Sequence, residues 1–252
     1  MFFDTHAHLD DEAFDSDRDE LISSFASVGV TRILNASSDM PSSYATVSLC
    51  KKYDFIYGAV GIHPEAADRM QEGDIEKIAE LAKKKNIVAI GETGLDYYWD
   101  NVPRDVQQKA FREHCALALE LGLPIVVHDR EAHRDCADIL GEFTGLRVVY
   151  HCFSGSVEYA RELVARRYYF SFGGAVTFKN AKTAPEVLRA IPHERVMLET
   201  DCPYMAPVPH RGKRNHPGLV LHVAEKIAEL WGMTPEEVGR ITTANALEFF
   251  GI

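Results

Sequence analysis

The sequence lacks the features that mark several classes of protein. Its five cysteines are scattered and no two form a C-x-x-C pair, which argues against a disulfide framework and against a thiolate zinc site. Its apolar runs are far shorter than the roughly 20 residues that span a bilayer. The first residues, MFFDTHAH, have neither the basic start nor the apolar core of a signal peptide. We therefore expect a cytoplasmic protein with reduced cysteines and no membrane association.

Positive charge is also scarce. The 27 lysines and arginines are outnumbered by 38 aspartates and glutamates, which gives a net charge of −11. No global positive field attracts polyanions, so a nucleic-acid substrate needs local positive charge from basic side chains or metal ions. Hydrophobic residues make up 46% of the chain, no linker rich in Ser, Gly or Pro interrupts it, and no segment marks an interface with a protein partner. These features predict one domain over residues 1–252.

Short β-branched or aromatic runs alternate with longer segments of helical periodicity. The runs predict eight strands, at 2–6, 32–35, 55–62, 87–92, 124–128, 147–151, 169–173 and 195–201. Eight βα units in about 250 residues fit a (β/α)8 TIM barrel, an α/β fold. A doubly wound open sheet is the alternative, but the GAVGIHP turn is not the G-x-G-x-x-G loop of a dinucleotide-binding fold.

The first predicted strand ends in two histidines, His6 and His8, separated by a single alanine. Residues i and i+2 of a strand project to the same side, so the two imidazoles face one way, about 7 Å apart at the backbone. This arrangement suits one metal ion. Taken alone, the motif also fits two surface histidines at a frayed terminus. The residues at the other strand ends distinguish this alternative from a metal site.

Potential metal ligands stand at or just past the carboxyl ends of six of the eight predicted strands: His6 with His8, His63, Glu92, His128, His151 and Asp201. In a barrel these ends meet at one face, where the active site forms. Imidazoles and carboxylates without cysteine suit Zn, Mn, Fe, Co or Ni, and carboxylates also admit Mg. The set is too large for one tetrahedral ion but fits two ions about 3.5–4 Å apart with one bridging carboxylate. This pattern predicts a binuclear hydrolase.

Other roles are open for some of these residues when each is taken singly. A carboxylate that ends an apolar run, as Glu92 and Asp201 do, is seldom buried without a cation partner. His128 and His151 also fit satisfied core histidines. His63, one residue past its strand, fits a ligand, a turn residue or a substrate contact, of which we favour the last. The histidines in or beside predicted helices are expected to be structural or solvated: His114, His133, His193 and His222.

A long loop, DCPYMAPVPHRGKRNHPG, follows the eighth predicted strand. Long loops in compact domains are usually functional, although an ordinary solvated turn is the alternative. Arg211, Lys213 and Arg214 would give it a positive rim suited to phosphate. Aromatic residues near predicted strand ends offer faces on which exposed bases stack: Tyr97, Tyr98, Trp99, Phe153 and Tyr204.

Seven stretches, in this order along nearly the whole chain, resemble the TatD-related metal-dependent hydrolases: DTHAHLD, VGIHP, GETGLDYYW, HCFSG, ETDCPYMAP, RGKRN and TTANALEFFGI. The resemblance implies a TIM barrel with two divalent metal ions (Mg, Mn or Zn). It also implies DNase activity, often that of a 3′→5′ exonuclease on single-stranded DNA. One departure is His216, which follows RGKRN where the family commonly has a glutamate.

The resemblance also implies a role for each ligand. One ion is held by His6, His8, Glu92 and Asp201, and Glu92 bridges to a second ion completed by His128 and His151. His63 contacts the substrate phosphate. Asp201 orients or deprotonates the attacking water, which suits a carboxylate that is bound to metal and faces the nucleophile.

Two other functions compete with this interpretation. The nearest is an amidohydrolase that cleaves C–N or ester bonds of a small molecule, because the same barrel and H-x-H opening would serve it. No lysine ends a predicted strand to act as a carbamylated bridge, but Glu92 could take that place. The second is a catalytically silent metal-binding or scaffold protein, against which the intact ligands at six strand ends argue.

Overall fold

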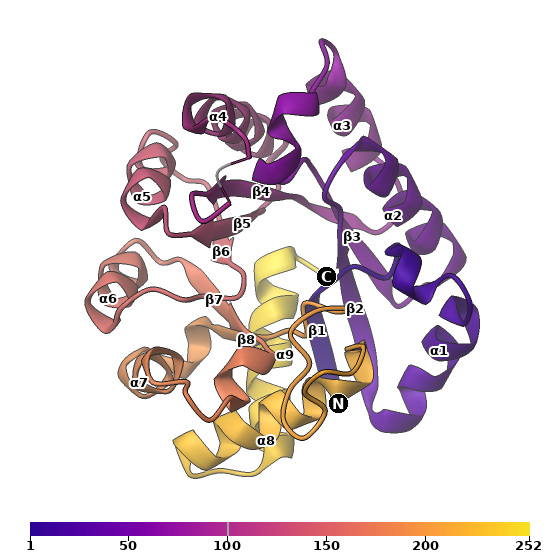
Figure 1. Cartoon of the computed structure of the whole chain (residues 1–252), viewed down its shortest axis with the longest axis vertical. Coiled ribbons are helices and arrows are strands. Elements are labelled where there is room, and N and C mark those ends of the chain that lie inside the picture. The colour runs from indigo at the N-terminus through magenta and orange to yellow at the C-terminus, as the bar shows by residue number, and fades with distance from the viewer. Residues whose placement is uncertain (100) are drawn as a thin grey trace. The chain divides into compact units, whose positions relative to one another are not determined.

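A computed structural model describes residues 1–99 and 101–252 of the chain. Eight strands lie in one sheet in the order β1-β2-β3-β4-β5-β6-β7-β8 and alternate with helices along the chain (Figure 1). This is the (β/α)8 class, and the predicted fold is confirmed. No helix among the described residues is both long and apolar enough to cross a membrane.

The strands are β1 Phe2–Ala7, β2 Val30–Ala36, β3 Ile56–Val60, β4 Ile87–Asp96, β5 Ile125–Arg130, β6 Val148–Tyr150, β7 Tyr169–Phe172 and β8 Val196–Leu198. The α-helices of the described residues are α1 Arg18–Ser24, α2 Met40–Lys52, α3 Asp74–Ala82, α4 Arg104–Leu121, α5 His133–Gly141, α6 Val157–Ala165, α7 Thr183–Ala190, α8 Val220–Trp231 and α9 Pro235–Phe250. Short 3-10 helices lie at η1 Glu12–Phe14, η2 Phe25–Val28, η3 Pro64–Arg69, η4 Gly174–Thr177, η5 His193–Arg195 and η6 Pro217–Leu219.

Every strand ends within two residues of its predicted bound except β4 and β8, and both of these larger differences concern candidate functional residues. Strand β4 runs four residues past Glu92, to Asp96, because its last residues pair with β5 through His128 and Arg130. Strand β8 ends at Leu198, so Asp201 lies in the following loop and not in the strand. The chain leaves the β ladder there because the Asp4 carboxylate accepts hydrogen bonds from the Thr200 backbone and hydroxyl.

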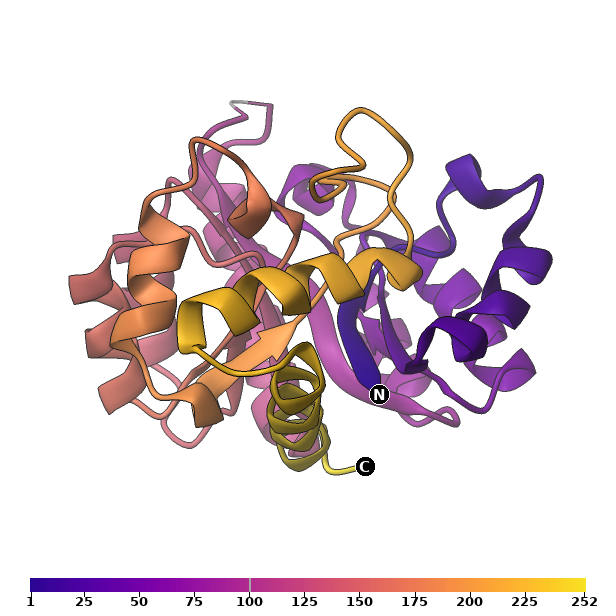
Figure 2. The same cartoon turned by 90° about the horizontal axis from the view of Figure 1, so that it is seen from below.

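Contacts divide the chain into two compact units, described separately below. Unit 1 comprises residues 1–35 and 152–252. In it β1 pairs with β2 and β7 with β8, while α9 packs against β1 and β8. Helices α8 and α9 cross steeply (Figure 2). Gly239 allows the close approach of α9 to β1, because a Cβ there would lie 2.7 Å from the Phe2 ring.

Unit 2 comprises residues 36–151. Strands β3 to β6 are parallel neighbours, and helices α2 to α5 pack on one side of them (Figure 1). Gly94 of β4 has a positive φ, and a Cβ there would lie 2.0 Å from the His128 carbonyl oxygen. The backbones of β4 and β5 therefore approach closely where both strands carry functional residues.

His114 of α4 is a structural residue, as predicted. It is fully buried; its Nε2 accepts the Ile62 N–H at 3.1 Å, and its Nδ1 lies 2.7 Å from the Ala110 carbonyl oxygen. Burial lowers the pKa of His114 to about 4, although the Ala110 carbonyl acts in the opposite direction. The neutral imidazole thus fixes the segment that leads from β3 into His63.

We expect His114 to make folding stability depend on pH. The unfolded imidazole, with a pKa of about 6.5, binds more protons than the folded one between about pH 4 and 6.5, so stability falls as the pH falls through that window. The loss attributable to His114 reaches about 3 kcal/mol near pH 4. His114→Leu should cost about 1–3 kcal/mol at pH 7, because the Ile62 N–H loses its partner.

Urea unfolding of both proteins at pH 7, 5 and 4 measures this dependence. The stability advantage of the wild type should shrink as the pH falls. Cys115→Ala, which alters a buried neighbour on the same helix, should lower stability by a similar amount at each pH. Parallel pH profiles for wild type and His114→Leu would contradict the assignment.

Candidate metal-binding clusters

Side chains with metal-binding atoms gather at the carboxyl ends of strands in both units. In unit 1, the Asp201 cluster consists of His6 and His8 from the β1 end and Asp201 from the loop after β8. In unit 2, the Glu92 cluster consists of His63, Glu92, His128 and His151, which lie in or just after β3 to β6. The predicted site residues thus fall into two groups.

The Asp201 cluster brings two imidazoles and one carboxylate together. The Nε2 atoms of His6 and His8 are 3.2 Å apart, and Asp201 Oδ1 lies 3.5 Å from the His8 nitrogen and 4.0 Å from the His6 nitrogen. Neighbouring ligand atoms of a four-coordinate ion with bonds of about 2.0–2.2 Å are separated by about 3.3–3.6 Å. The spacing and chemistry of these donors therefore fit a divalent ion.

A buried carboxylate, Asp4, supports the Asp201 cluster from the same strand. It accepts the hydroxyl and backbone N–H of Thr200 at 2.5 and 2.9 Å and the His6 N–H at 3.3 Å. Burial raises the pKa of Asp4 to about 8 against the lowering effect of these hydrogen bonds. Asp4 thereby fixes both the β1 end and the turn that carries Asp201. We did not predict this role, although Asp4 precedes His6 by two residues and so shares its side of the strand.

The Glu92 cluster is centred on one carboxylate oxygen. Glu92 Oε1 lies 2.7 Å from His151 Nε2, 2.9 Å from His128 Nδ1 and 3.4 Å from His63 Nε2. The facing nitrogens of His128 and His151 are 3.1 Å apart. A nearly buried glutamate surrounded by imidazole nitrogens at these distances offers a divalent ion a mixed oxygen and nitrogen donor set.

His63 differs from the other histidines of its cluster in that a hydrogen bond fixes which of its ring nitrogens carries the proton. Its Nδ1 accepts the Glu65 backbone N–H at 3.2 Å, where the chain enters η3. The neutral ring therefore carries its proton on Nε2, the atom that faces Glu92. An N–H at this position can donate a hydrogen bond to an anionic oxygen.

Asp96, at the end of β4, orients His128. Its Oδ2 lies 2.9 Å from His128 Nε2, while its Oδ1 accepts the backbone N–H groups of Tyr98 and Trp99. Burial lowers the pKa of His128, but the hydrogen bonds to Asp96 and Glu92 outweigh it and raise the pKa to about 10. A carboxylate behind a ligating imidazole fixes the ring and increases its basicity. We did not predict a role for Asp96, because it lies beyond the predicted end of the strand.

The basic loop after β8 has three cations in different surroundings. Arg214 binds Asp17 through two hydrogen bonds of 2.8 and 2.5 Å, so its charge is largely neutralised. The Arg211 guanidinium lies 3.7 Å from the centre of the Phe178 ring, and Lys213 is exposed. Buried Asn215 donates to the carbonyl oxygens of Thr200 and Tyr204, which ties the loop to the residues around Asp201.

Two further loop residues were singled out in the sequence. Tyr204 is 56% exposed, its hydroxyl donates to Asp11 at 3.0 Å, and its ring lies edge-on to His8. Tyr204 thus lies beside the Asp201 cluster, where a substrate contact was predicted. The His216 ring stacks on Phe25 at 6.2 Å, and burial lowers its pKa. The residue at which the sequence departs from the family pattern therefore packs against η2.

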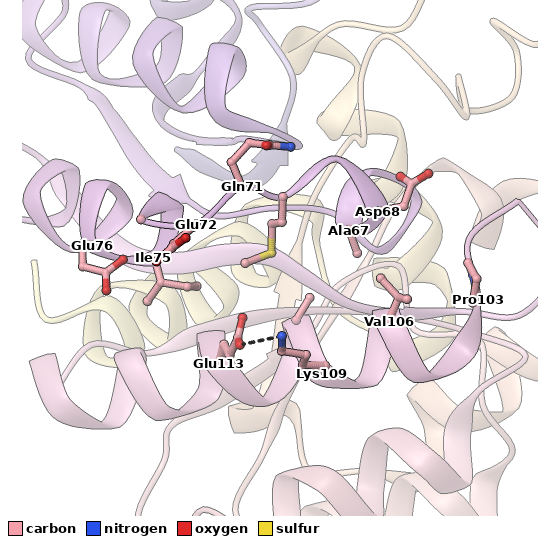
Figure 3. A pocket seen from close by; sticks show the side chains of 13 residues that line it. Ala67, Asp68, Gln71, Glu72, Ile75, Glu76, Pro103, Val106, Lys109 and Glu113 are labelled. Atoms are coloured by element: carbon pink, nitrogen blue, oxygen red, sulfur yellow. Dashed lines mark ion pairs between the residues drawn. The ribbon is translucent and has the colours of Figure 1, made fainter.

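A separate hollow in unit 2 has a volume of about 760 Å³ and lies between the segment 67–76 and α4 (Figure 3). Apolar side chains such as Met70 and Val106 line it. Its rim carries four carboxylates, those of Asp68, Glu72, Glu76 and Glu113, and one lysine, Lys109, whose Nζ lies 3.9 Å from Glu113. No residue of the Glu92 cluster lines this hollow, and its charge does not suit a polyanion.

Comparison with known proteins shows which family the chain resembles. A family model described as TatD related DNase matches residues 3–251. The chain is 48% identical to a Bacillus subtilis protein named uncharacterized metal-dependent hydrolase YabD. The match covers 100% of this chain and 100% of the relative. It is 32% identical to a Cronobacter sakazakii protein named 3′-5′ ssDNA/RNA exonuclease TatD, with 98% of this chain and 97% of the relative covered.

A solved structure supports the same relationship. The crystal structure of YJJV, a TatD homologue from Escherichia coli, superposes with a TM-score of 0.93 at 27% sequence identity. The match covers 100% of this chain and 98% of the other. The agreement extends through all eight βα units and therefore includes every strand end that carries a candidate ligand.

We expect Asp96→Asn to weaken divalent metal binding about 10–100-fold while the fold is retained, because the His128 ring loses its carboxylate partner. Calorimetric titration of the metal-stripped protein with Mn²⁺ measures the effect. Glu225→Gln is the matched control, since Glu225 holds a ring nitrogen of His222 at a comparable 2.8 Å on α8. Equal affinities for Asp96→Asn and wild type would rule out this supporting role.

Proposed function

The chain belongs to the TatD family of metal-dependent hydrolases, and from this premise we propose that it is a 3′→5′ exonuclease that hydrolyses phosphodiester bonds of single-stranded DNA. The family model is described as a DNase, and the name of the Cronobacter relative supports the direction and the single-stranded substrate. The observation that carries the proposal is the pair of histidine and carboxylate clusters at the strand ends. The family match spans both units, so we propose that residues 1–252 act as one domain.

The two clusters would hold two divalent ions per chain, Mg, Mn or Zn. In (β/α)8 enzymes the active site forms at the carboxyl ends of the strands, the ends that carry both clusters. His6, His8 and Asp201 would hold one ion, and Glu92, His128 and His151 would hold the other. When bound, such ions lower the pKa of a water molecule and neutralise charge on phosphoryl oxygens.

The side chains themselves supply the remaining chemistry. Asp201 orients the attacking water and accepts its proton, because it is the partly exposed carboxylate of its cluster. His63 donates a hydrogen bond from its Nε2–H to a phosphoryl oxygen and stabilises the charge that develops there. Tyr204, Arg211 and Lys213 contact the rest of the DNA strand, whereas Arg214 contributes mainly through its pair with Asp17.

Asp201→Asn should lower kcat about 10²–10⁴-fold with little change in fold or DNA affinity, because the amide cannot accept the proton. The assay follows a 5′-labelled single-stranded oligonucleotide over time with added Mg²⁺ or Mn²⁺. Wild type should shorten it stepwise from the 3′ end. Asp138→Asn, an exposed aspartate of α5, is the control and should behave as wild type.

If no oligonucleotide is cleaved with any metal, but a cyclic amide or an aryl ester is, the protein is instead a small-molecule amidohydrolase. Undiminished cleavage by Asp201→Asn would remove Asp201 from the mechanism. Because Asp201 is also a proposed ligand, the metal content of each protein is measured alongside its activity, which separates loss of metal from loss of the proton acceptor.

Metal content tests the assignment of the ions separately from activity. Reconstituted wild type should contain two ions per chain, and Glu92→Gln should contain fewer, because the carboxylate of the Glu92 cluster loses its charge. Elemental mass spectrometry after gel filtration gives the stoichiometry. Glu65→Gln, which changes an acidic residue outside the proposed ligand set, should retain both ions. A wild-type content of one ion would contradict the binuclear centre.

A further inference from the structure

Two aromatic side chains stand half-exposed where β4 ends. Tyr98 and Trp99 are 49% and 46% exposed, and their rings meet edge to face with centres 4.9 Å apart. Of the other predicted stacking residues, Phe153 is buried, and the hydroxyls of Tyr97 and exposed Tyr204 donate to Asp135 and Asp11. Large apolar faces exposed side by side are a feature of binding surfaces.

The Asp96 carboxylate connects these aromatic residues to the Glu92 cluster. Its Oδ1 accepts the backbone N–H groups of Tyr98 and Trp99 at 3.0 and 3.1 Å, and its Oδ2 lies 2.9 Å from His128 Nε2. One buried side chain therefore sets both the orientation of a proposed metal ligand and the position of the aromatic turn.

Arg130 adds a positive charge to the same surface. It follows His128 by two residues on β5, and its guanidinium carbon lies 3.9 Å from the Tyr98 ring centre and 5.7 Å from that of Trp99. It forms no ion pair with the residues for which the structure gives positions. A guanidinium stacked on a ring keeps the N–H groups of its edge available for a phosphate.

We infer that Tyr98, Trp99 and Arg130, the aromatic platform, bind one nucleotide of a single-stranded nucleic acid. The base stacks on Trp99 and the adjoining phosphate accepts hydrogen bonds from Arg130. The inference rests on the proposed function for the kind of substrate, but it assigns a binding site outside the metal clusters. Because a base within a duplex is stacked on both faces, the platform favours unpaired strands.

Fluorescence of Trp99 reports base stacking directly. The chain has two tryptophans, and Trp231 stacks on His193 and donates to the Leu188 carbonyl oxygen. In metal-loaded Asp201→Asn carrying Trp231→Phe, emission therefore comes from Trp99 alone and the DNA stays intact. Pentathymidylate should quench this emission saturably. A five-unit abasic strand should not quench it and should bind about tenfold more weakly.

Substitutions separate the contributions of base and phosphate to binding. The affinity of each variant for labelled strands is measured by fluorescence anisotropy in the Asp201→Asn background. Trp99→Ala should weaken pentathymidylate binding about tenfold and leave abasic-strand binding unchanged. Arg130→Gln should weaken both, because both strands have phosphates. Tyr44→Ala, which removes another half-exposed aromatic ring from α2, is the matched control and should change neither.

The inference is overturned if the abasic strand quenches Trp99 emission as strongly as pentathymidylate does. It is also overturned if Trp99→Ala in the Asp201→Asn background binds both strands with the same affinity as Asp201→Asn alone. Trp99→Phe guards against a folding artefact, since it keeps an aromatic face and should retain most of the affinity. Absence of DNA cleavage by wild type would refute the proposed function, while the binding titrations would still decide the platform.

Discussion

The cost of burying a carboxylate without a partner governs how both clusters are built. An isolated buried charge is so unfavourable that it must be neutralised, paired or bound to a metal. Asp4 meets this requirement through Thr200 and the His6 N–H, and Asp96 meets it through His128 and two backbone N–H groups. In each case the group that satisfies the carboxylate is a functional residue or its neighbour. The need for partners therefore positions the chemistry.

The two clusters differ in how a buried carboxylate supports their candidate metal ligands. In the Asp201 cluster the supporting carboxylate acts through the backbone, because Asp4 fixes the turn after β8 and leaves the Asp201 side chain partly exposed. In the Glu92 cluster the support is direct, because Asp96 holds the far side of the His128 ring. The first arrangement leaves a carboxylate accessible to water, and the second fixes an imidazole rigidly. This contrast agrees with a proton-accepting role for Asp201 and a purely ligating role for His128.

Much of the fold could be predicted from the sequence because each strand has a local signal, a short apolar, β-branched or aromatic run. The candidate ligands were predicted because they stand at the ends of six of these runs. The bounds of β4 and β8 could not be predicted, because they depend on pairing with β5 and on the contact between Asp4 and Thr200, which lie far apart in sequence. The role of Asp96 was missed for that reason. The platform residues were named as aromatic candidates, but only their exposure separated Tyr98 and Trp99 from buried Phe153.

The charge distribution sets a further condition on a polyanionic substrate. With a net charge of −11, the chain repels DNA at long range, so binding depends on short contacts at particular residues. Arg214 is already paired with Asp17, while Arg211 and Lys213 of the same loop are exposed. In unit 2, Arg130 and the N–H of His63 are the positive and donating groups that we propose for phosphate. Arg130 and His128 are two residues apart on β5 and so project from the same side of the strand. That spacing places phosphate binding next to a proposed metal ligand, where attraction over a few ångströms can offset repulsion by the rest of the protein.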